Sequence, residues 1–120
     1  PKRIINFVLL EREAKKSWLQ IFKNVFTNSH ILASKVDWLH FGFATMALGK
    51  ENVAKAMNVK MAVSLRGFDI NVYPLKTPNC YNSLWENVDK IHTISDDLIQ
   101  KAFSLGLSQS IYYKKITPAR

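Results

Sequence analysis

The hydrophobic pattern of the first 30 residues is helical. Apolar side chains recur every three or four positions among lysines and glutamates, which is the spacing of one face of a helix. We therefore expect one or two helices between Ile5 and Thr27. The apolar positions in the clearest stretch are Trp18, Leu19, Ile21, Phe22, Val25 and Phe26.

From Asp37 onward, short apolar runs alternate with helical stretches. The runs have the length and the aromatic or β-branched content of strands. Strands that alternate with helices predict a parallel sheet joined by right-handed crossovers. We expect an α/β fold, a partial Rossmann-like three-layer sandwich with helices on both faces of four parallel strands, preceded by an N-terminal helical segment. The strands are expected at about residues 37–42, 60–65, 90–94 and 111–116.

The segments between these strands predict three helices and a loop. Helical patterns cover about Thr45 to Met57, about Tyr81 to Val88, and the residues after Ser95. Ser95 is a typical N-cap, and Gly106 suits the left-handed position that follows a helix. Residues 67–79 contain one glycine and two prolines and are expected to form a long polar loop.

Composition narrows the classes of protein. The 120 residues suffice for one core, and the net charge of +8 favours anionic partners. P-loop, dinucleotide-binding and nucleic-acid motifs are absent, so nucleic acid is not expected as a partner. The single cysteine, Cys80, excludes an internal disulfide and favours a reducing compartment. The three histidines lack metal-ligand spacing, so no metal site is expected.

The residues that follow each strand are candidates for chemistry, because parallel sheets bind ligands at the carboxyl ends of their strands. Arg66 could hold a phosphate or carboxylate, or could pair with Asp69 and only shape the loop. Gly67 would admit a ligand or serve a tight turn, and Asp69 would orient a hydroxyl or cap the loop. His40 would face the crevice or bond to its neighbours. Ser95 has no evident base beside it, so capping is favoured over nucleophilic chemistry.

Four motifs keep a common order and spacing across residues 36–118. They are DWLHFGF at 37–43, KMAVSLRGFDI at 60–70, IHTIS at 91–95 before a helix that ends in LGL at 105–107, and KITP at 115–118. Together they resemble the N-terminal domain of a family 4 (group 1) glycosyltransferase of the GT-B fold. The resemblance implies a retaining, metal-independent transfer of a sugar to a glycan, lipid-linked or small-molecule acceptor, in polysaccharide or glycoconjugate synthesis. The donor substrate would be a nucleotide-sugar, and no cofactor is implied.

The resemblance also implies roles for particular residues. Arg66 stands where many family members have a histidine near the transferred sugar. Because an arginine cannot act as a base near neutral pH, its implied role is charge stabilisation towards the donor phosphate or an anionic acceptor. The substrate-binding residues implied by the motifs are His40, Gly42, Arg66, Gly67, Asp69 and Ser95.

The domain organisation implied by the resemblance is that of a fragment. Residues 1–35 would be a helical segment of the same domain, and residues 36–120 the Rossmann-like half of the N-terminal domain. The family's first strand and its C-terminal nucleotide-sugar domain would lie outside this sequence, so the chain alone would be inactive. The strand at 37–42 would then expose a hydrophobic edge, which favours a dimer. Pro118 is expected to end the last strand.

Two alternatives stay open at this point. The basic, aromatic segment from Lys15 to Phe26 could lie in the headgroup layer of a membrane, as in family members that act on lipid-linked acceptors, or its apolar face could pack on the sheet. A cytoplasmic enzyme, peripheral on the inner face of a membrane, would suit the first interpretation. The alternative to the transferase is a non-enzymatic Rossmann-like module that binds an anionic ligand or an acidic partner.

Overall fold

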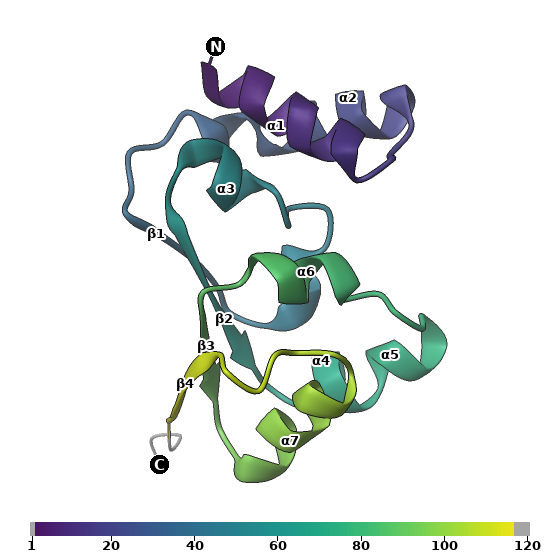
Figure 1. Cartoon of the computed structure of the whole chain (residues 1–120), viewed down its shortest axis with the longest axis vertical. Helices are drawn as coiled ribbons and strands as arrows, with labels where there is room; N and C mark the ends of the chain where they lie inside the picture. Colours follow the sequence, from purple (N-terminus) through teal and green to yellow (C-terminus); the bar gives the residue numbers. More distant parts are fainter. Residues whose placement is uncertain (1, 117–120) are drawn as a thin grey trace. The chain divides into compact units, whose positions relative to one another are not determined.

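The structure, a computed structural model that describes residues 2–116, has a mixed α/β architecture (Figure 1). Four strands form one sheet in the order β1-β2-β3-β4, and β2, β3 and β4 pair in parallel. The sheet is flanked by helices and preceded by a helical segment, so the predicted fold class is confirmed. The strands are β1 Trp38–Phe41, β2 Lys60–Leu65, β3 Lys90–Thr93 and β4 Tyr112–Lys115.

The strand boundaries agree with the sequence prediction to within one residue at each end. One or two N-terminal helices were expected between Ile5 and Thr27; two are present, and they extend beyond this range at both ends. The predicted end of the last strand at Pro118 lies outside the described residues. The helices are α1 Lys2–Glu13, α2 Trp18–Leu32, the 3-10 helix η1 Ala44–Ala47, α3 Val53–Met57, α4 Phe68–Asn71, α5 Tyr73–Lys76, α6 Asn82–Asn87 and α7 Asp96–Ser104.

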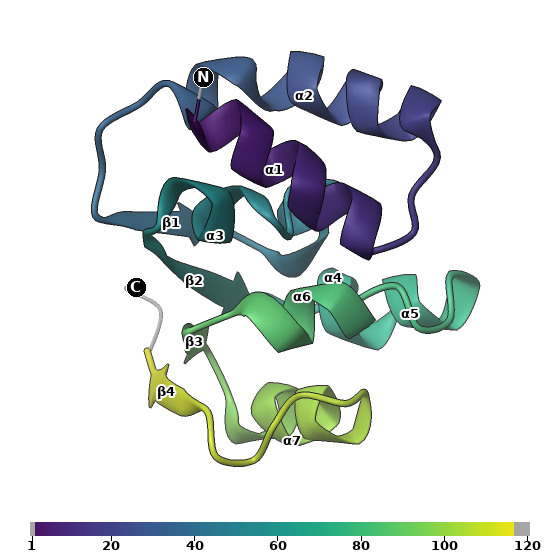
Figure 2. The same ribbon diagram turned by 45° about the horizontal axis from the view of Figure 1, so that its top comes forward.

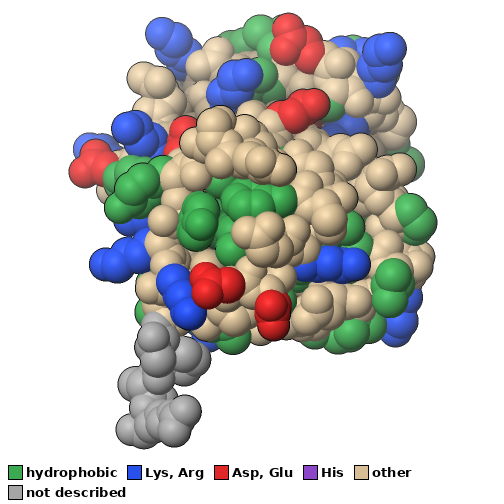
Figure 3. Space-filling model, turned by 60° about the horizontal axis from the view of Figure 1, so that its bottom comes forward, with side chains coloured by type: hydrophobic (Ala, Val, Ile, Leu, Met, Phe, Trp, Pro, Cys, Tyr) green, Lys and Arg blue, Asp and Glu red, His purple; other side chains and the backbone are tan. Residues whose placement is uncertain are grey.

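Contacts divide the chain into two compact units. The first contains the residues up to Leu39 together with Gly49–Lys60, and the second contains His40–Leu48 together with the residues from Met61 onward. Lys and Arg side chains are spread over the face shown in Figure 3, as the net charge of +8 leads one to expect. No helix within residues 2–116 is long and apolar enough to cross a membrane.

The first unit is built on a helical hairpin. Helices α1 and α2 lie side by side and run in opposite directions (Figure 2), and α3 packs against both. Ser17 begins α2 as an N-cap, since its side chain accepts a hydrogen bond from the backbone N–H of Gln20. The buried apolar core of this unit includes Phe7, Leu32, Val53, Ala56 and Met57.

A buried carboxylate joins the segments of this unit. Glu11 is fully buried and accepts hydrogen bonds from Lys16 Nζ at 2.7 Å, Asn24 Nδ2 at 2.7 Å and Asn52 Nδ2 at 2.6 Å. The charge of Glu11 is therefore paired and hydrogen-bonded, as a buried charge requires. Burial also raises the pKa of Glu51, whose Oε1 lies 3.9 Å from Lys16 Nζ.

The second unit buries alternate residues of its central strands. Ile91 and Thr93 of β3 are buried, whereas Lys90 and His92 are partly exposed, so β3 has the period-two pattern of a strand with one covered face. Strand β4 is exposed at every position. The covering helices contribute Ile70, Leu84, Leu98, Ile99 and Ala102 to the core.

Two sequence predictions about the connections are wrong. The helix expected at about Thr45 to Met57 is split into η1 and α3, because Leu48 is extended and Gly49 has a φ of +81°. The loop expected at residues 67–79 contains α4 and α5. Two buried residues fix these helical turns: Ile70 is fully buried, and the buried Pro74 lies in the first turn of α5. The polar residues around them led to the prediction of a loop.

The order of the strands places β1 at one end of the sheet. An edge strand presents unpaired backbone groups that can pair with another chain. The dimer expected through this edge stays a prediction, and a strict monomer in light scattering at high concentration would count against it.

Candidate functional site

The loops after β1 and β2 are tied together by one buried carboxylate. Asp69 is 2% exposed, and its Oδ2 accepts a hydrogen bond from the backbone N–H of Ala44 at 2.8 Å. Its Oδ1 accepts from the backbone N–H groups of Gly67 at 2.8 Å and Arg66 at 3.1 Å. Since both oxygens of Asp69 bind backbone donors, the geometry favours the loop-capping role over the orientation of a ligand hydroxyl.

The guanidinium of Arg66 is exposed and is held from one side only. Its Nε donates to the carbonyl oxygen of Gly42 at 3.0 Å. Within residues 2–116 no carboxylate forms an ion pair with it, so the predicted alternative of a pair with Asp69 is not seen. The two terminal amino groups of Arg66 therefore remain available to a ligand, and the bond to Gly42 limits the orientations they adopt.

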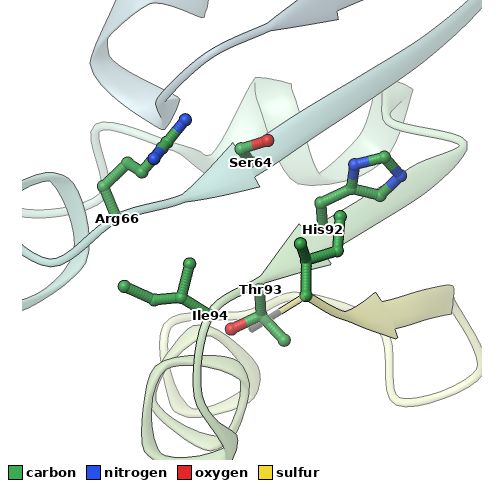
Figure 4. A pocket seen from close by; sticks show the side chains of 6 residues that line it. Ser64, Arg66, His92, Thr93 and Ile94 are labelled. Atoms are coloured by element: carbon green, nitrogen blue, oxygen red, sulfur yellow. The ribbon is translucent and has the colours of Figure 1, made fainter. Parts of the chain in front are cut away.

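A small pocket lies at the carboxyl ends of the strands (Figure 4). Its volume is about 110 Å³, which is below the roughly 300–1,000 Å³ of a typical site for a drug-sized molecule. This volume suits a single small group, such as a phosphate, better than a whole nucleotide-sugar. The lining residues are Ser64, Arg66, His92, Thr93, Ile94 and Ile116.

Two histidines lie beside this pocket. His40 Nε2 is 2.8 Å from Ser64 Oγ, and the His40 and His92 rings meet edge to face with centroids 4.9 Å apart. His40 thus bonds to a neighbour, as one of the two sequence alternatives expected. Burial, with the positive charges of His40, Lys90 and Lys114, lowers the pKa of His92. This shift favours the neutral form of His92, and its buried Nε2 has no hydrogen-bond partner among the described residues.

Ser95 and Gly67 have structural roles in this geometry. Ser95 Oγ accepts a hydrogen bond from the backbone N–H of Leu98 at 3.2 Å, which confirms the predicted N-cap of α7. Ser95 does not line the pocket. Gly67 has a φ of +154°, and a methyl group there would meet no atom within 4 Å. Backbone conformation, not crowding, therefore requires glycine at this position.

Of the six residues expected at the site, Arg66 lines the pocket and the others lie around it. Hydrogen bonds link Arg66 to Gly42, and Asp69 to Arg66 and Gly67, while His40 contacts the pocket through Ser64. Ser95 caps a helix, and its carbonyl oxygen accepts a hydrogen bond from Oγ1 of the lining residue Thr93 at 2.8 Å. The strand-end pattern did not predict four of the lining residues, Ser64, Thr93, Ile94 and Ile116, and it gave His92 no role in the site.

A signal for two of the missed residues was present in the strand pattern. Side chains two positions apart in a strand face the same side, so Ser64 shares the face of Arg66. The parallel register pairs Ser64 with His92, which brings that histidine to the same face. Knowledge of the register, however, comes only from the folded sheet.

Within residues 2–116 no group of three or more His, Cys, Asp or Glu side chains could hold a metal ion. Comparison with protein-family models, with curated proteins and with solved structures finds no match to this chain.

Proposed function

We propose that this chain is the N-terminal part of a retaining glycosyltransferase, which moves a sugar from a nucleotide-sugar to a glycan, lipid-linked or small-molecule acceptor. The supporting observation is the hydrogen bond from Arg66 Nε to the Gly42 carbonyl at 3.0 Å. It joins two motifs, DWLHFGF and KMAVSLRGFDI, that the resemblance assigns to one substrate region. The bond between Asp69 and the N–H of Ala44 joins the same two loops.

Arg66 is the residue proposed to act on the substrate. When the bond between the sugar and the nucleotide breaks, negative charge develops on the departing phosphate. A guanidinium held by Gly42 stabilises this charge without having to reorganise, so it lowers the energy of the transition state more than that of the bound substrate. Arg66 has no role as a base, because it stays protonated.

The size of the pocket suggests that this chain forms only part of the substrate site. Its volume of about 110 Å³ holds a phosphate-sized group, and the rest of a nucleotide-sugar would need a second wall. We therefore propose that the isolated chain is inactive. We also propose that the whole enzyme acts in the cytoplasm. The synthesis of polysaccharides or glycoconjugates is the proposed context.

The test uses the complete product of the reading frame that encodes these residues. The release of nucleoside diphosphate from a panel of nucleotide-sugars is measured for the wild type, Arg66→Ala and Arg66→Lys. We expect Arg66→Ala to lower kcat/KM by about a hundredfold and Arg66→Lys to recover only part of the loss, because lysine lacks the planar fork. The matched control is Lys101→Ala, since Lys101 is an exposed cation on α7.

Two outcomes would contradict parts of the proposal. Wild-type turnover by Arg66→Ala would remove Arg66 from the mechanism. Absence of turnover with every nucleotide-sugar would contradict the transferase itself.

A second candidate function is a non-enzymatic module that binds an anion. The small size of the pocket beside Arg66 favours it, because one inorganic anion fills such a volume. The amide resonances of Arg66 and Gly67 can be followed by NMR during a titration with inorganic phosphate. Saturable shifts in this chain, together with no turnover by the complete product, would favour the binding module.

A further inference from the structure

A second hollow surface surrounds Trp85, at the opposite end of the strands from Arg66. Trp85 belongs to α6, which leads into the amino end of β3, and Gly106 and Ser108 lie in the loop that leads into the amino end of β4. The pocket beside Arg66 lies at the carboxyl ends of the strands (Figure 4). Because β3 and β4 are parallel, their amino ends meet at the same end of the sheet. The surface around Trp85 is therefore separate from the site proposed to act on a phosphate.

The groove at Trp85 is polar and lacks a cation. Its volume is about 480 Å³, within the roughly 300–1,000 Å³ of sites for small molecules. The sequence has 17 lysines and arginines, yet none of the described residues that line the groove is one of them. The lining residues are Asn82, Trp85, Glu86, Gly106 and Ser108; we call this surface the indole groove.

A buried donor lies beside the indole groove. Trp85 is 7% exposed, and its Nε1 has no hydrogen-bond partner among the described residues. The adjacent ring atom, Cδ1, faces Gly106, since a Cβ atom placed on Gly106 would lie 3.5 Å from it. Because Gly106 has no side chain over this edge of the ring, a small displacement of its loop opens the N–H group to the groove. A ligand oxygen that accepts from this N–H removes the cost of leaving a buried donor unpaired.

A smaller pocket shares Trp85 with the indole groove. Its volume is about 140 Å³, and Asn79, Cys80 and Ser104 are among its other lining residues. Burial raises the pKa of the Cys80 thiol, so the thiol is uncharged near neutral pH. The polar side chains of the two pockets are therefore neutral except for the carboxylate of Glu86.

Asn82 and Glu86 place two polar groups on the same side of α6. They are separated by one helical turn, so their side chains are neighbours on the helix surface. Both are exposed, and within residues 2–116 Glu86 forms no ion pair. A carboxylate accepts hydrogen bonds from two hydroxyl groups, and an amide both donates and accepts. This pair suits a ligand that presents several hydroxyl groups close together.

We propose that the indole groove binds a neutral saccharide. Hydroxyl groups of the sugar bond to Asn82 and Glu86, an oxygen of the sugar accepts from Trp85 Nε1, and its C–H groups pack against the edge of the indole. The carboxylate of Glu86 repels an anion, and no cation among the described lining residues offsets that repulsion. This inference does not depend on the glycosyltransferase proposal, because the groove and Arg66 lie at opposite ends of the strands.

The test follows the indole N–H resonances of the complete chain by NMR during titrations with sugars. Maltotriose, cellotriose and triacetylchitotriose, which are neutral trisaccharides, are compared with inorganic phosphate. We expect at least one trisaccharide to shift the Trp85 resonance saturably and phosphate to leave it unchanged. Trp18 and Trp38, which are 61% and 45% exposed, are internal controls for non-specific contact with sugar. Their resonances are identified with Trp18→Phe and Trp38→Phe.

Variants of the two polar groups test the location of the site. Asn82→Ala and Glu86→Gln should each weaken sugar binding by about fivefold, because each loses or weakens one hydrogen bond. Since both side chains are exposed, the variants should keep the far-UV circular dichroism of the wild type. The matched controls are Asn71→Ala and Glu13→Gln, which replace an exposed amide and an exposed carboxylate outside the groove. Both controls should bind sugar as the wild type does.

Three outcomes would overturn the proposal. The first is a Trp85 resonance that none of the three trisaccharides shifts, or that shifts only with phosphate. The second is an equal shift of all three indole resonances, since the sugar would then contact the chain without a defined site. The third is unchanged sugar affinity in both Asn82→Ala and Glu86→Gln.

Discussion

Replacement of Asp69 should destabilise the fold more than replacement of any exposed carboxylate. The side chain is 2% exposed and accepts three backbone hydrogen bonds, from Ala44, Arg66 and Gly67. These bonds connect the ends of β1 and β2. Asp69→Ala leaves all three donors without their acceptor, and Asp69→Asn turns one acceptor oxygen into a donor that faces an N–H group.

The magnitude follows from the burial of each donor. A hydrogen bond to a charged group contributes about 1.5–3 kcal/mol. The bond to Ala44 is buried, whereas those to Arg66 and Gly67 are partly buried, so water can replace the latter in part. We expect Asp69→Ala to lower the free energy of unfolding by about 3–4 kcal/mol and Asp69→Asn by about 2 kcal/mol. The larger loss is a substantial part of the roughly 5–15 kcal/mol typical of small domains.

Urea denaturation followed by far-UV circular dichroism measures these differences. The matched control is Asp97→Asn, an exposed carboxylate in the first turn of α7, for which we expect a loss of about 0.5 kcal/mol. The order of stability should be wild type, then Asp69→Asn, then Asp69→Ala. A loss below about 1 kcal/mol for Asp69→Ala would refute the reasoning, because the carboxylate would then not hold the two loops together.

Two further predictions concern polar groups in the interior. Glu11→Ala leaves the ammonium of Lys16 and two asparagine amides without their acceptor, so it should lower the unfolding free energy by about 3–5 kcal/mol. The control Glu13→Ala, at an exposed position on the same helix, should change the unfolding free energy little. Equal effects of the two variants in urea denaturation would contradict this prediction. Burial lowers the pKa of His92, so below about pH 6.5 the unfolded chain binds a proton that the folded chain does not. The unfolding free energy should therefore fall as the pH drops from about 7.5 to about 5.5, and His92→Gln should reduce this slope. An unchanged slope would count against the lowered pKa of His92.

Local patterns in the sequence were enough to predict the strands and the ends of α7. Alternating or continuous apolar runs act within a few residues, and the four strands lie where they predict. Ser95 and Gly106 were also identified correctly, since a cap bonds within the same turn and a φ of +114° favours glycine whatever surrounds it. The same local reasoning failed at Gly49 and at residues 67–79, where distant contacts decide the backbone.

The composition of the candidate site was predictable only in part. Arg66, Gly67 and Asp69 are three neighbours that any scan of strand ends would select. The role of Asp69, however, depends on Ala44, which lies 25 residues away. Ser64 and His92 join the site through the register between β2 and β3, and register is a property of two segments together.

The hydrophobic pattern of the sequence did not predict which face of α2 is buried. Its helical period was evident, and both a buried and an exposed apolar face were consistent with it. The tertiary structure buries Asn24 and Asn28 beside Ile21 and Leu32. Glu11 and the Gly49 carbonyl, 13 and 21 residues from their partners, require the two asparagine amides inside. Periodicity along one segment specifies that a helix forms, but which face is buried depends on the donors and acceptors that other segments bring to it.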